Sequence, residues 1–279
     1  MPTYKAKGLV IKSYRLGEAD KIVKIFTPDS GLISAVAKGA FNMKSKFSGR
    51  LELYNVIDCE FSQGKTLDII SQAEIIEIFS SISGDFFKFN YTQMISEILL
   101  KTQSEKTSSH NLFRLTYLLI KKINNTEIND EVSLQMLLVF FMINFSKIMG
   151  FSPMLSCCTV CGREIMKKNT EERDNKHIKY EVIENIGNRV DKIFFSVKYG
   201  GTVCRNCSLD KKSVIFLNSA EASLFAGLFQ CHLEDLENFV VNYKTSSKLL
   251  DLMTEYVSFH SEIALLSPAY LKKIHKNIV

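Results

Sequence analysis

The sequence lacks the motifs by which common enzyme classes are recognised. It contains no Walker phosphate loop, no GxGxxG after a strand pattern, no HExxH and no GxSxG. Its histidines are few and scattered, and none lies near a matched nucleophile: His110, His177, His232, His260 and His275. These absences argue against the best-known classes of nucleotide-dependent enzymes, metalloproteases and serine hydrolases. We therefore expect a protein that is not an enzyme, with a zinc-dependent nuclease as the remaining enzymatic alternative.

Long apolar runs are also scarce. The opening MPTYKAKGLVIKSYRLGEADK has no apolar core of the kind found in signal peptides, which predicts a cytoplasmic protein without a membrane anchor. Residues 132–150 approach the roughly 20 apolar residues of a membrane span. Polar residues interrupt this segment at Gln135, Asn144, Ser146 and Lys147. We expect a buried core helix there, and fractionation without detergent distinguishes it from a span.

Short runs rich in Val, Ile and Phe fill residues 4–80. Five strands are expected, at 5–16, 21–29, 31–39, 51–63 and 65–76, and the first four end in turn signals such as Pro28-Asp29-Ser30-Gly31. No helical pattern separates them. Five short strands in sequence predict a small closed barrel, because closure removes exposed strand edges.

Helical spacing begins at about residue 84 and covers 85–103, 111–123 and 132–149, and it resumes at 219–239 and 246–264. Asp85 and Asn111 are candidate N-caps, Gly150 is a candidate helix terminator, and Asn218 with Glu221 has capping-box spacing. The length of 279 residues also favours more than one domain. We expect an α+β protein: a barrel domain over 1–80 and an α-helical domain over 81–279, interrupted by a cysteine-rich insertion at about 153–215.

Two CxxC pairs mark that insertion, Cys158–Cys161 and Cys204–Cys207. Each pair curls the backbone so that both thiolates face one ion, and two pairs complete a tetrahedral four-sulfur shell. Structural zinc is therefore expected, ahead of an iron–sulfur cluster or a thiol redox site. Four cysteines leave no open position for chemistry. Cys157 could replace Cys158, although Cys158 keeps the two-residue spacer.

Three further Cys and His residues lie outside the two CxxC pairs. His177, in the polar stretch between the two pairs, is a possible ligand but fits a solvated loop better. Cys59 lies in a strand pattern and Cys231 in a helix pattern, and both are expected to be small buried hydrophobic residues.

Charge is unevenly distributed in the barrel. Residues 1–50 contain ten basic and three acidic side chains, whereas residues 51–80 contain one basic and six acidic side chains. The densest basic run is KGAFNMKSKFSGR, residues 38–50, which also contains Phe41 and Phe47. Such a loop can follow phosphates while its rings stack on unpaired bases. The alternative is a solvated loop whose phenylalanines anchor it to the core.

Several segments together resemble one protein family. GLVIKSYRLGEADKIVKIFTPDSGLISAVAKGA, the basic loop, GRLELYNVIDCEF, MGFSPMLSCCTVCGR and GGTVCRNC follow one another in the order seen in the RecO family of bacterial recombination mediators. The resemblance extends over nearly the whole chain and is strongest in residues 5–76 and 141–207. Here the spacer between the cysteine pairs is longer than is common in the family, and the family's cysteines vary.

The resemblance implies an oligonucleotide-binding (OB) barrel, a helical domain and a structural Zn²⁺ held by the four cysteines named above. It implies DNA repair: binding of single- and double-stranded DNA, annealing of complementary strands, and loading of RecA with RecR and sometimes RecF onto DNA coated by single-stranded-DNA-binding protein. It implies a cytoplasmic, nucleoid-associated location. The candidate DNA contacts are Lys12, Arg15, Lys21, Lys38, Lys44, Lys46, Phe47 and Arg50.

The alternative function is a protein-interaction adaptor. In this hypothesis the helical domain docks RecR and the apolar, acidic tail of single-stranded-DNA-binding protein, and DNA contact is secondary. A basic rim for that tail could draw on Lys121, Lys122, Lys248 or Lys272.

Overall fold

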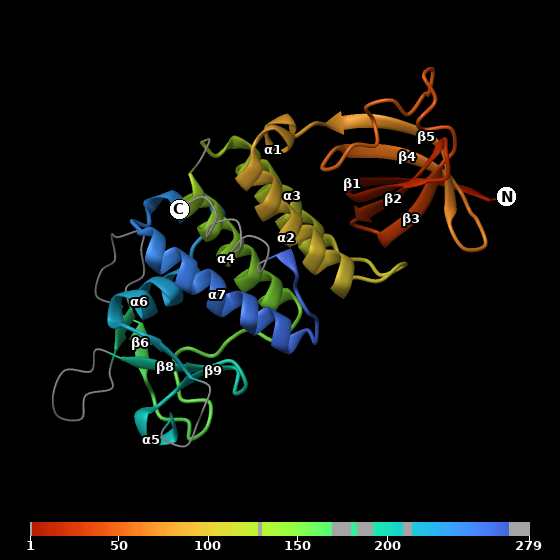
Figure 1. Cartoon of the computed structure of the whole chain (residues 1–279). Helices are drawn as coiled ribbons and strands as arrows, with labels where there is room; N and C mark the ends of the chain where they lie inside the picture. The colour runs from red at the N-terminus through yellow and green to blue at the C-terminus, as the bar shows by residue number, and fades with distance from the viewer. Residues whose placement is uncertain (1, 128–129, 169–179, 183–191, 209–213, 268–279) are drawn as a thin grey trace. The chain divides into compact units, whose positions relative to one another are not determined.

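The computed structural model describes residues 2–127, 130–168, 180–182, 192–208 and 214–267 (Figure 1). The chain divides at Asp130 into two compact units. The first contains the strands β1–β5 and the helices α1–α3, and the second contains α4 to α7 with the cysteine-rich element. The predicted domain boundary at residue 80 stays a prediction, because compact grouping is not a test of independent folding.

The N-terminal strands close into a barrel in the order β1-β2-β3-β5-β4. Their bounds are β1 (Thr3–Leu16), β2 (Asp20–Thr27), β3 (Gly31–Ala37), β4 (Val56–Ser62) and β5 (Asp68–Glu77). β3 pairs with β5 in parallel and the other neighbours are antiparallel. The five-stranded barrel predicted from the sequence is confirmed. The fourth strand begins later than expected, because Asn55 turns back to donate to the carbonyls of Gly49 and Arg50.

Closure of the barrel depends on β1, which pairs with β4 through residues 3–9 and with β2 through residues 9–16. β1 must therefore bend, and its register shifts between Val10 and Lys12. At the bend Gly8 lies against β2: a Cβ there would come within 2.6 Å of both Ile25 Cγ2 and the Phe26 carbonyl oxygen. Only glycine allows this close approach of the two backbones.

Three helices complete the first unit: α1 (Ser80–Gly84), α2 (Phe86–Thr102) and α3 (His110–Asn125). Asp85 caps α2 by accepting from the Lys88 amide at 2.9 Å, which confirms that predicted cap. The predicted cap at Asn111 is wrong, because the helix begins earlier and Ser109 occupies its N-cap position. The Ser109 amide is already bonded to the Pro28 carbonyl at 2.8 Å, which fixes the start of α3 against the barrel.

In the second unit, α4 (Glu131–Ile148) and α7 (Tyr243–His260) form the helical core. By length and composition α4 could cross a membrane, but 67% of its residues are buried inside the structure, as in a core helix. Its polar Gln135 accepts a 2.5 Å hydrogen bond from Ser246 of α7, which compensates for its burial. Gly150 follows the helix with φ +85°, as predicted for a helix terminator.

Small sheets and short helices form the rest of the second unit. They are β6 (Met166–Lys168), β7 (Tyr180–Val182), β8 (Ile193–Ser196), β9 (Gly201–Val203), α5 (Arg205–Ser208), β10 (Ile215–Leu217), α6 (Ser219–Leu228) and the 3-10 helix η1 (Leu233–Asn238). β10, β8 and β9 make one sheet, and β6 and β7 another. The capping box of Asn218 and Glu221 is confirmed. The helix predicted to reach residue 239 ends at Leu228. After it the chain reverses, and the Phe239 ring packs so close to Gly227 that a Cβ added there would lie 3.2 Å from the ring.

The bend of β1 leads to a prediction about stability. Gly8→Ala is expected to lower the free energy of unfolding by about 1–3 kcal/mol, because the added methyl group overlaps β2. Gly84→Ala is the matched control, since a Cβ at Gly84 meets no atom within 4 Å and φ is not positive there. Chemical denaturation of both variants measures the difference, and equal stabilities would show that β1 tolerates a side chain at the bend.

Candidate functional site

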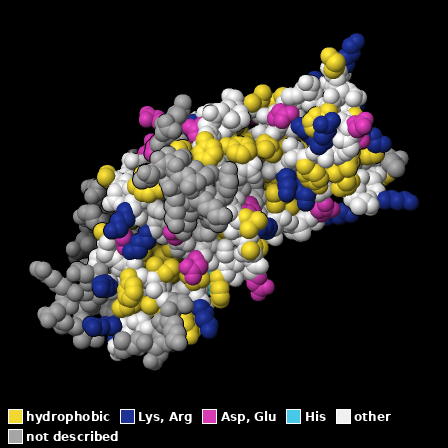
Figure 2. Space-filling model, in the orientation of Figure 1, with side chains coloured by type: hydrophobic (Ala, Val, Ile, Leu, Met, Phe, Trp, Pro, Cys, Tyr) yellow, Lys and Arg dark blue, Asp and Glu magenta, His cyan; other side chains and the backbone are white. Residues whose placement is uncertain are grey.

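The basic run lies at one end of the barrel. It connects the end of β3 to the start of β4 and meets the β1–β2 turn, where the Phe41 amide donates to the Ala19 carbonyl at 2.9 Å. Figure 2 shows Lys and Arg side chains on the barrel, interspersed with hydrophobic ones. We call residues 38–50 the basic loop.

The basic loop is anchored by apolar side chains that enter the barrel. Phe47 is 4% exposed and Leu51 is 1% exposed, and both belong to the barrel core with Val23, Ile25 and Cys59. Phe47, predicted as a DNA contact, is therefore part of the hydrophobic core in this structure. Its ring could stack on a base only if the loop left the barrel.

A buried cation adds a second anchor. Lys21 is 8% exposed, and its ammonium group lies 2.9 Å from a Glu52 carboxylate oxygen and 3.3 Å from the Leu51 carbonyl. Its charge is thus already compensated within the protein. Of the predicted DNA contacts, Lys21 and Phe47 hold the loop in place, which leaves six cations for an external anion.

Those six cations are exposed, and they come from the loop and from β1: Lys12, Arg15, Lys38, Lys44, Lys46 and Arg50. Lys46 donates to the Ser71 carbonyl at 2.6 Å and Arg50 to the Ala73 carbonyl at 3.0 Å, so both lie along β5. Arg15 donates to the carbonyls of its own turn. In the described part of the chain none of the six has an ion pair, and their charges are free to meet phosphates.

Phe41 is the exposed ring of the loop. It is 46% exposed, and its centroid lies 5.1 Å from the Arg15 guanidinium carbon and 5.6 Å from the Lys21 ammonium. These cation–π contacts orient the ring beside the basic side chains. Sequence spacing does not distinguish the two phenylalanines of the run, and only the packing of the loop shows that Phe41 faces solvent.

Lys24 is a further cation of this surface that the sequence does not mark as a candidate DNA contact. Lys24 of β2 is paired directly opposite Lys12 of β1. Like charges at opposed positions of two strands repel, and a bound anion removes that cost. The sequence alone does not show that Lys12 and Lys24 are neighbours, because this depends on the register of the two strands.

The four cysteines of the two CxxC pairs come together in the second unit. The sulfur atoms of Cys158, Cys161, Cys204 and Cys207 lie within 4.8 Å of one another. Zn–S bonds of about 2.3 Å in a tetrahedron place sulfurs about 3.8 Å apart, and the Cys161 and Cys204 sulfurs are separated by 3.7 Å. The cluster is thus compatible with a metal site and with four-sulfur zinc ligation.

Backbone contacts hold the two pairs together. Thr202 of β9 is 1% exposed, and its hydroxyl lies 3.0 Å from the carbonyl oxygens of both Leu155 and Cys157. Its own carbonyl accepts from the Thr159 amide at 2.9 Å. Gly162 has φ +75°, which lets the chain turn directly after Cys161. The first pair is therefore fixed to the strand that leads into the second.

The shifts in pKa within the cluster favour a thiolate at Cys158 and thiols at Cys204 and Cys207. Burial raises the pKa of Cys158, but backbone hydrogen bonds from Cys204, Cys161 and Val160 outweigh it and lower the pKa to about 6. Burial raises the pKa of Cys204, and the hydrogen bond with Cys204 raises that of Cys207. Since metals bind thiolates, loading the cluster would release the remaining protons.

The other candidate ligands lie outside the cluster. Cys157 is not one of the four clustered residues and pairs instead with Glu164 in an isolated bridge. His177 falls outside the described residues. Cys59 is 1% exposed in the barrel core, as expected. Cys231 is only partly buried and follows α6 rather than lying in a helix, so its predicted helical position is wrong.

Comparison with known proteins gives a consistent result. A family model described as recombination protein O N terminal matches residues 1–79, and one described as recombination protein O C terminal matches residues 83–179. The chain is similar to the DNA repair protein RecO of Caldanaerobacter subterraneus, with 28% identity covering 97% of this chain and 98% of that protein. The RecO proteins of Desulforamulus reducens (26% identity, 99% and 97% coverage) and Listeria monocytogenes serotype 4a (25%, 98% and 95%) are also similar.

The cysteine geometry predicts how metal content responds to substitution. Cys204→Ser should abolish binding of about one zinc per chain, because it removes a buried sulfur of the cluster. Cys157→Ser, adjacent to the cluster in sequence, should retain the metal. Elemental analysis of protein purified without chelator tests both variants, and zinc lost from both or from neither would contradict the assignment.

Proposed function

Because this chain belongs to the RecO family of DNA repair proteins, we propose that it binds single- and double-stranded DNA through the basic end of its barrel and anneals complementary strands. The observation that supports this proposal is the basic loop itself. Four exposed cations and an exposed phenylalanine lie on a loop that is anchored in the barrel core, and Lys12 and Arg15 of β1 add two further exposed cations.

The physical reasoning concerns charge and stacking. Cations that replace condensed counterions on the phosphates give binding that depends strongly on salt and little on sequence. A ring such as Phe41 adds stacking on unpaired bases of any identity. Two strands repel one another, and a shared cationic surface lowers that repulsion without a catalytic group. The proposed role is therefore not enzymatic.

The proposal extends to partners and location. In it the protein acts with RecR, and in some settings RecF, to load RecA onto DNA coated by single-stranded-DNA-binding protein. It acts in the bacterial cytoplasm, at the nucleoid. A Zn²⁺ held by the four cysteines would contribute folding energy to the second unit and would leave the DNA-binding surface of the barrel unchanged.

A second candidate function is a protein-interaction adaptor. It is favoured by a cavity of about 570 Å³ along α7, with Ile215, Tyr243 and Leu252 as apolar lining and Lys244 and Lys248 as basic lining. Such a site suits an apolar segment with an acidic end, as proposed for the tail of single-stranded-DNA-binding protein. Asp251 and Glu255 also line the cavity and would oppose a uniformly acidic ligand.

The DNA-binding proposal is tested by neutralising the loop. Lys44→Ala/Lys46→Ala/Arg50→Ala should weaken single-strand binding severalfold and reduce the slope of log K against log salt by about 2, since each lost phosphate contact contributes about 0.7. Fluorescence anisotropy with a labelled oligonucleotide at several salt concentrations measures both. Strand annealing should slow in parallel.

The matched control removes the same charge elsewhere. Lys167→Ala/Lys198→Ala/Lys244→Ala alters three exposed lysines of the second unit and should leave affinity and slope nearly unchanged. If the two triple variants behave alike, net charge alone accounts for binding and the basic loop has no special role.

The adaptor function is tested with a peptide. An acidic, apolar tail peptide of single-stranded-DNA-binding protein should bind the full chain, and Lys244→Glu should weaken it severalfold by charge reversal in the lining of the cavity. Lys198→Glu serves as the control for the same charge change. Unchanged peptide affinity in Lys244→Glu would remove this cavity as the docking site.

A further inference from the structure

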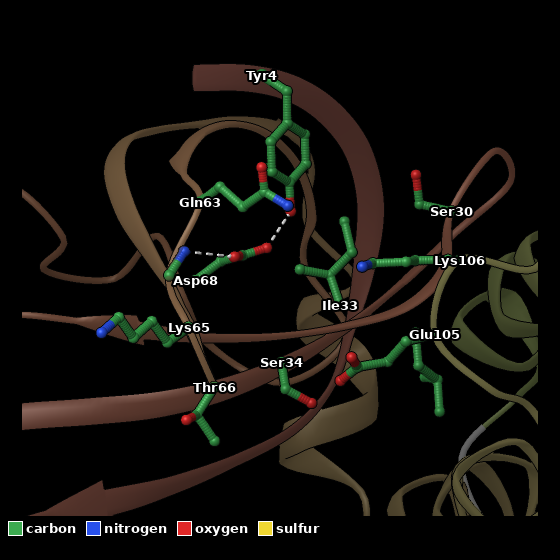
Figure 3. A pocket seen from close by; sticks show the side chains of 12 residues that line it. Tyr4, Ser30, Ile33, Ser34, Gln63, Lys65, Thr66, Asp68, Glu105 and Lys106 are labelled. Atoms are coloured by element: carbon green, nitrogen blue, oxygen red, sulfur yellow. Dashed lines mark hydrogen bonds between the residues drawn. The ribbon is translucent and has the colours of Figure 1, made fainter. Parts of the chain in front are cut away.

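A cavity of about 270 Å³ lies at the end of the barrel opposite the basic loop (Figure 3). The strand register fixes this position. Thr27 pairs with Gly31 and Thr3 with Ser62 at one end, whereas Leu16 pairs with Asp20 and Lys21 with Ala37 at the other. The cavity is formed at the first end by the start of β1, the β2–β3 and β4–β5 turns, and the loop between α2 and α3.

The wall contributed by residues 103–109 is firmly attached to the barrel. The Leu32 amide donates to the Ser104 carbonyl at 3.2 Å, and the Lys106 amide donates to the Ser30 carbonyl at 2.9 Å. Gly31 has φ +62°, and a Cβ there would come within 2.4 Å of the Ser104 carbonyl oxygen. The close approach of the two backbones makes the cavity a preformed feature of the first unit.

A carboxylate on one side of the cavity is held in a fixed orientation. Asp68 accepts a short hydrogen bond from the Tyr4 hydroxyl and a 2.9 Å hydrogen bond from the Gly64 amide (Figure 3). Burial and the bond to Asp68 raise the pKa of Tyr4, so its hydroxyl remains a donor. The remaining lone pairs of Asp68 and Tyr4 can accept hydrogen bonds from a ligand.

Two exposed side chains of opposite charge line the other side of the cavity. Figure 3 shows the side chains of Lys106 and Glu105 directed into the cavity, while Lys65 points away from its centre. Neither Glu105 nor Lys106 has an ion-pair partner among the described residues. Lys106 also has φ +61°, an unusual conformation for a residue with a side chain. Because both charges are exposed and no intramolecular ion pair holds them, both are available to a ligand that enters the cavity.

The chemistry of the cavity differs from that of the basic loop. With only Lys106 directed inward against the carboxylates of Asp68 and Glu105, the cavity can hold one phosphate at Lys106 but does not suit a chain of phosphates, so it is not a second groove for the DNA backbone. A ligand that fits must carry one anionic group for Lys106 and a hydrogen-bond donor for Glu105. A single nucleotide with an exocyclic amino group has both, and the volume is close to the roughly 300 Å³ lower limit of ligand sites.

We propose that this cavity binds one unpaired nucleotide whose base carries an exocyclic amino group, with the phosphate at Lys106 and the amino group at Glu105. The proposal deepens the proposed DNA-binding function and rests on it. Cytosine presents an amino donor at the position where thymine presents a carbonyl oxygen. A carboxylate accepts from the former and repels the latter, so the site prefers cytosine to thymine.

The position of the cavity suggests its use. One strand follows the basic loop, and a base of a second strand is held at the opposite end of the barrel. Bases held outside a duplex are available for pairing, which is what annealing requires. Phosphate contacts would set the position of the nucleotide, and the contact with Glu105 would determine base preference.

The experiment titrates the full chain with dCMP and with dTMP, followed by heteronuclear NMR, which measures weak binding. The unaltered protein should bind dCMP at least about fivefold more tightly than dTMP. Glu105→Gln should abolish the preference, because an amide can donate to the thymine carbonyl as well as accept from the amino group. Lys106→Met should weaken both nucleotides alike.

Controls separate this proposal from the proposed function. Glu127→Gln, an exposed residue after α3, should retain the preference. The basic-loop triple variant should lose oligonucleotide affinity yet keep its preference for dCMP. Equal binding of the two nucleotides, or a preference that survives Glu105→Gln, would overturn the cavity proposal alone. Loss of the preference in Glu127→Gln would also overturn it.

Discussion

The burial of Phe47 and Leu51 inside the closed barrel is the interaction on which the functional surface depends. A loop with four cations and no acid would otherwise be a solvated connection with many conformations. Two buried apolar side chains, with the ion pair between Lys21 and Glu52, tie it to the end of the barrel. The exposed cations and Phe41 are then presented on a fixed framework, which reduces the entropy lost on binding.

The barrel separates two kinds of chemistry between its ends. At the basic end, cations without internal ion pairs suit a phosphate chain of any sequence. At the other end, the cavity contains unpaired charges of both signs and a fixed carboxylate at Asp68, which suits a single small ligand. The cysteine cluster belongs to the second unit, and its four sulfurs lie close enough together to be compatible with a metal site. The proposed binding surfaces and the candidate metal site thus have different locations in the chain.

Features that depend on residues close together in the sequence could be predicted, whereas features that depend on contacts between distant residues could not. The CxxC pairs were recognised from sequence because a two-residue spacer is a local constraint, and the capping box at Asn218 is local for the same reason. The role of Phe47 could not be recognised from sequence. Phe41 and Phe47 lie in the same polar run and look equivalent, and only the packing shows that Phe47 is buried in the barrel. Lys21 likewise looked like a surface cation until β2 brought it beside Glu52.

The sequence by itself determined the five strands, the helical periodicity, the four-cysteine set and the family, because each depends on residue types at short and regular spacing. Only the tertiary structure decided which cations remain unpaired, which ring faces solvent, and that residues 4, 68, 105 and 106 share one cavity. These are outcomes of strand register and loop packing. They join residues that are up to 102 positions apart, between Tyr4 and Lys106, and no local pattern encodes such a meeting.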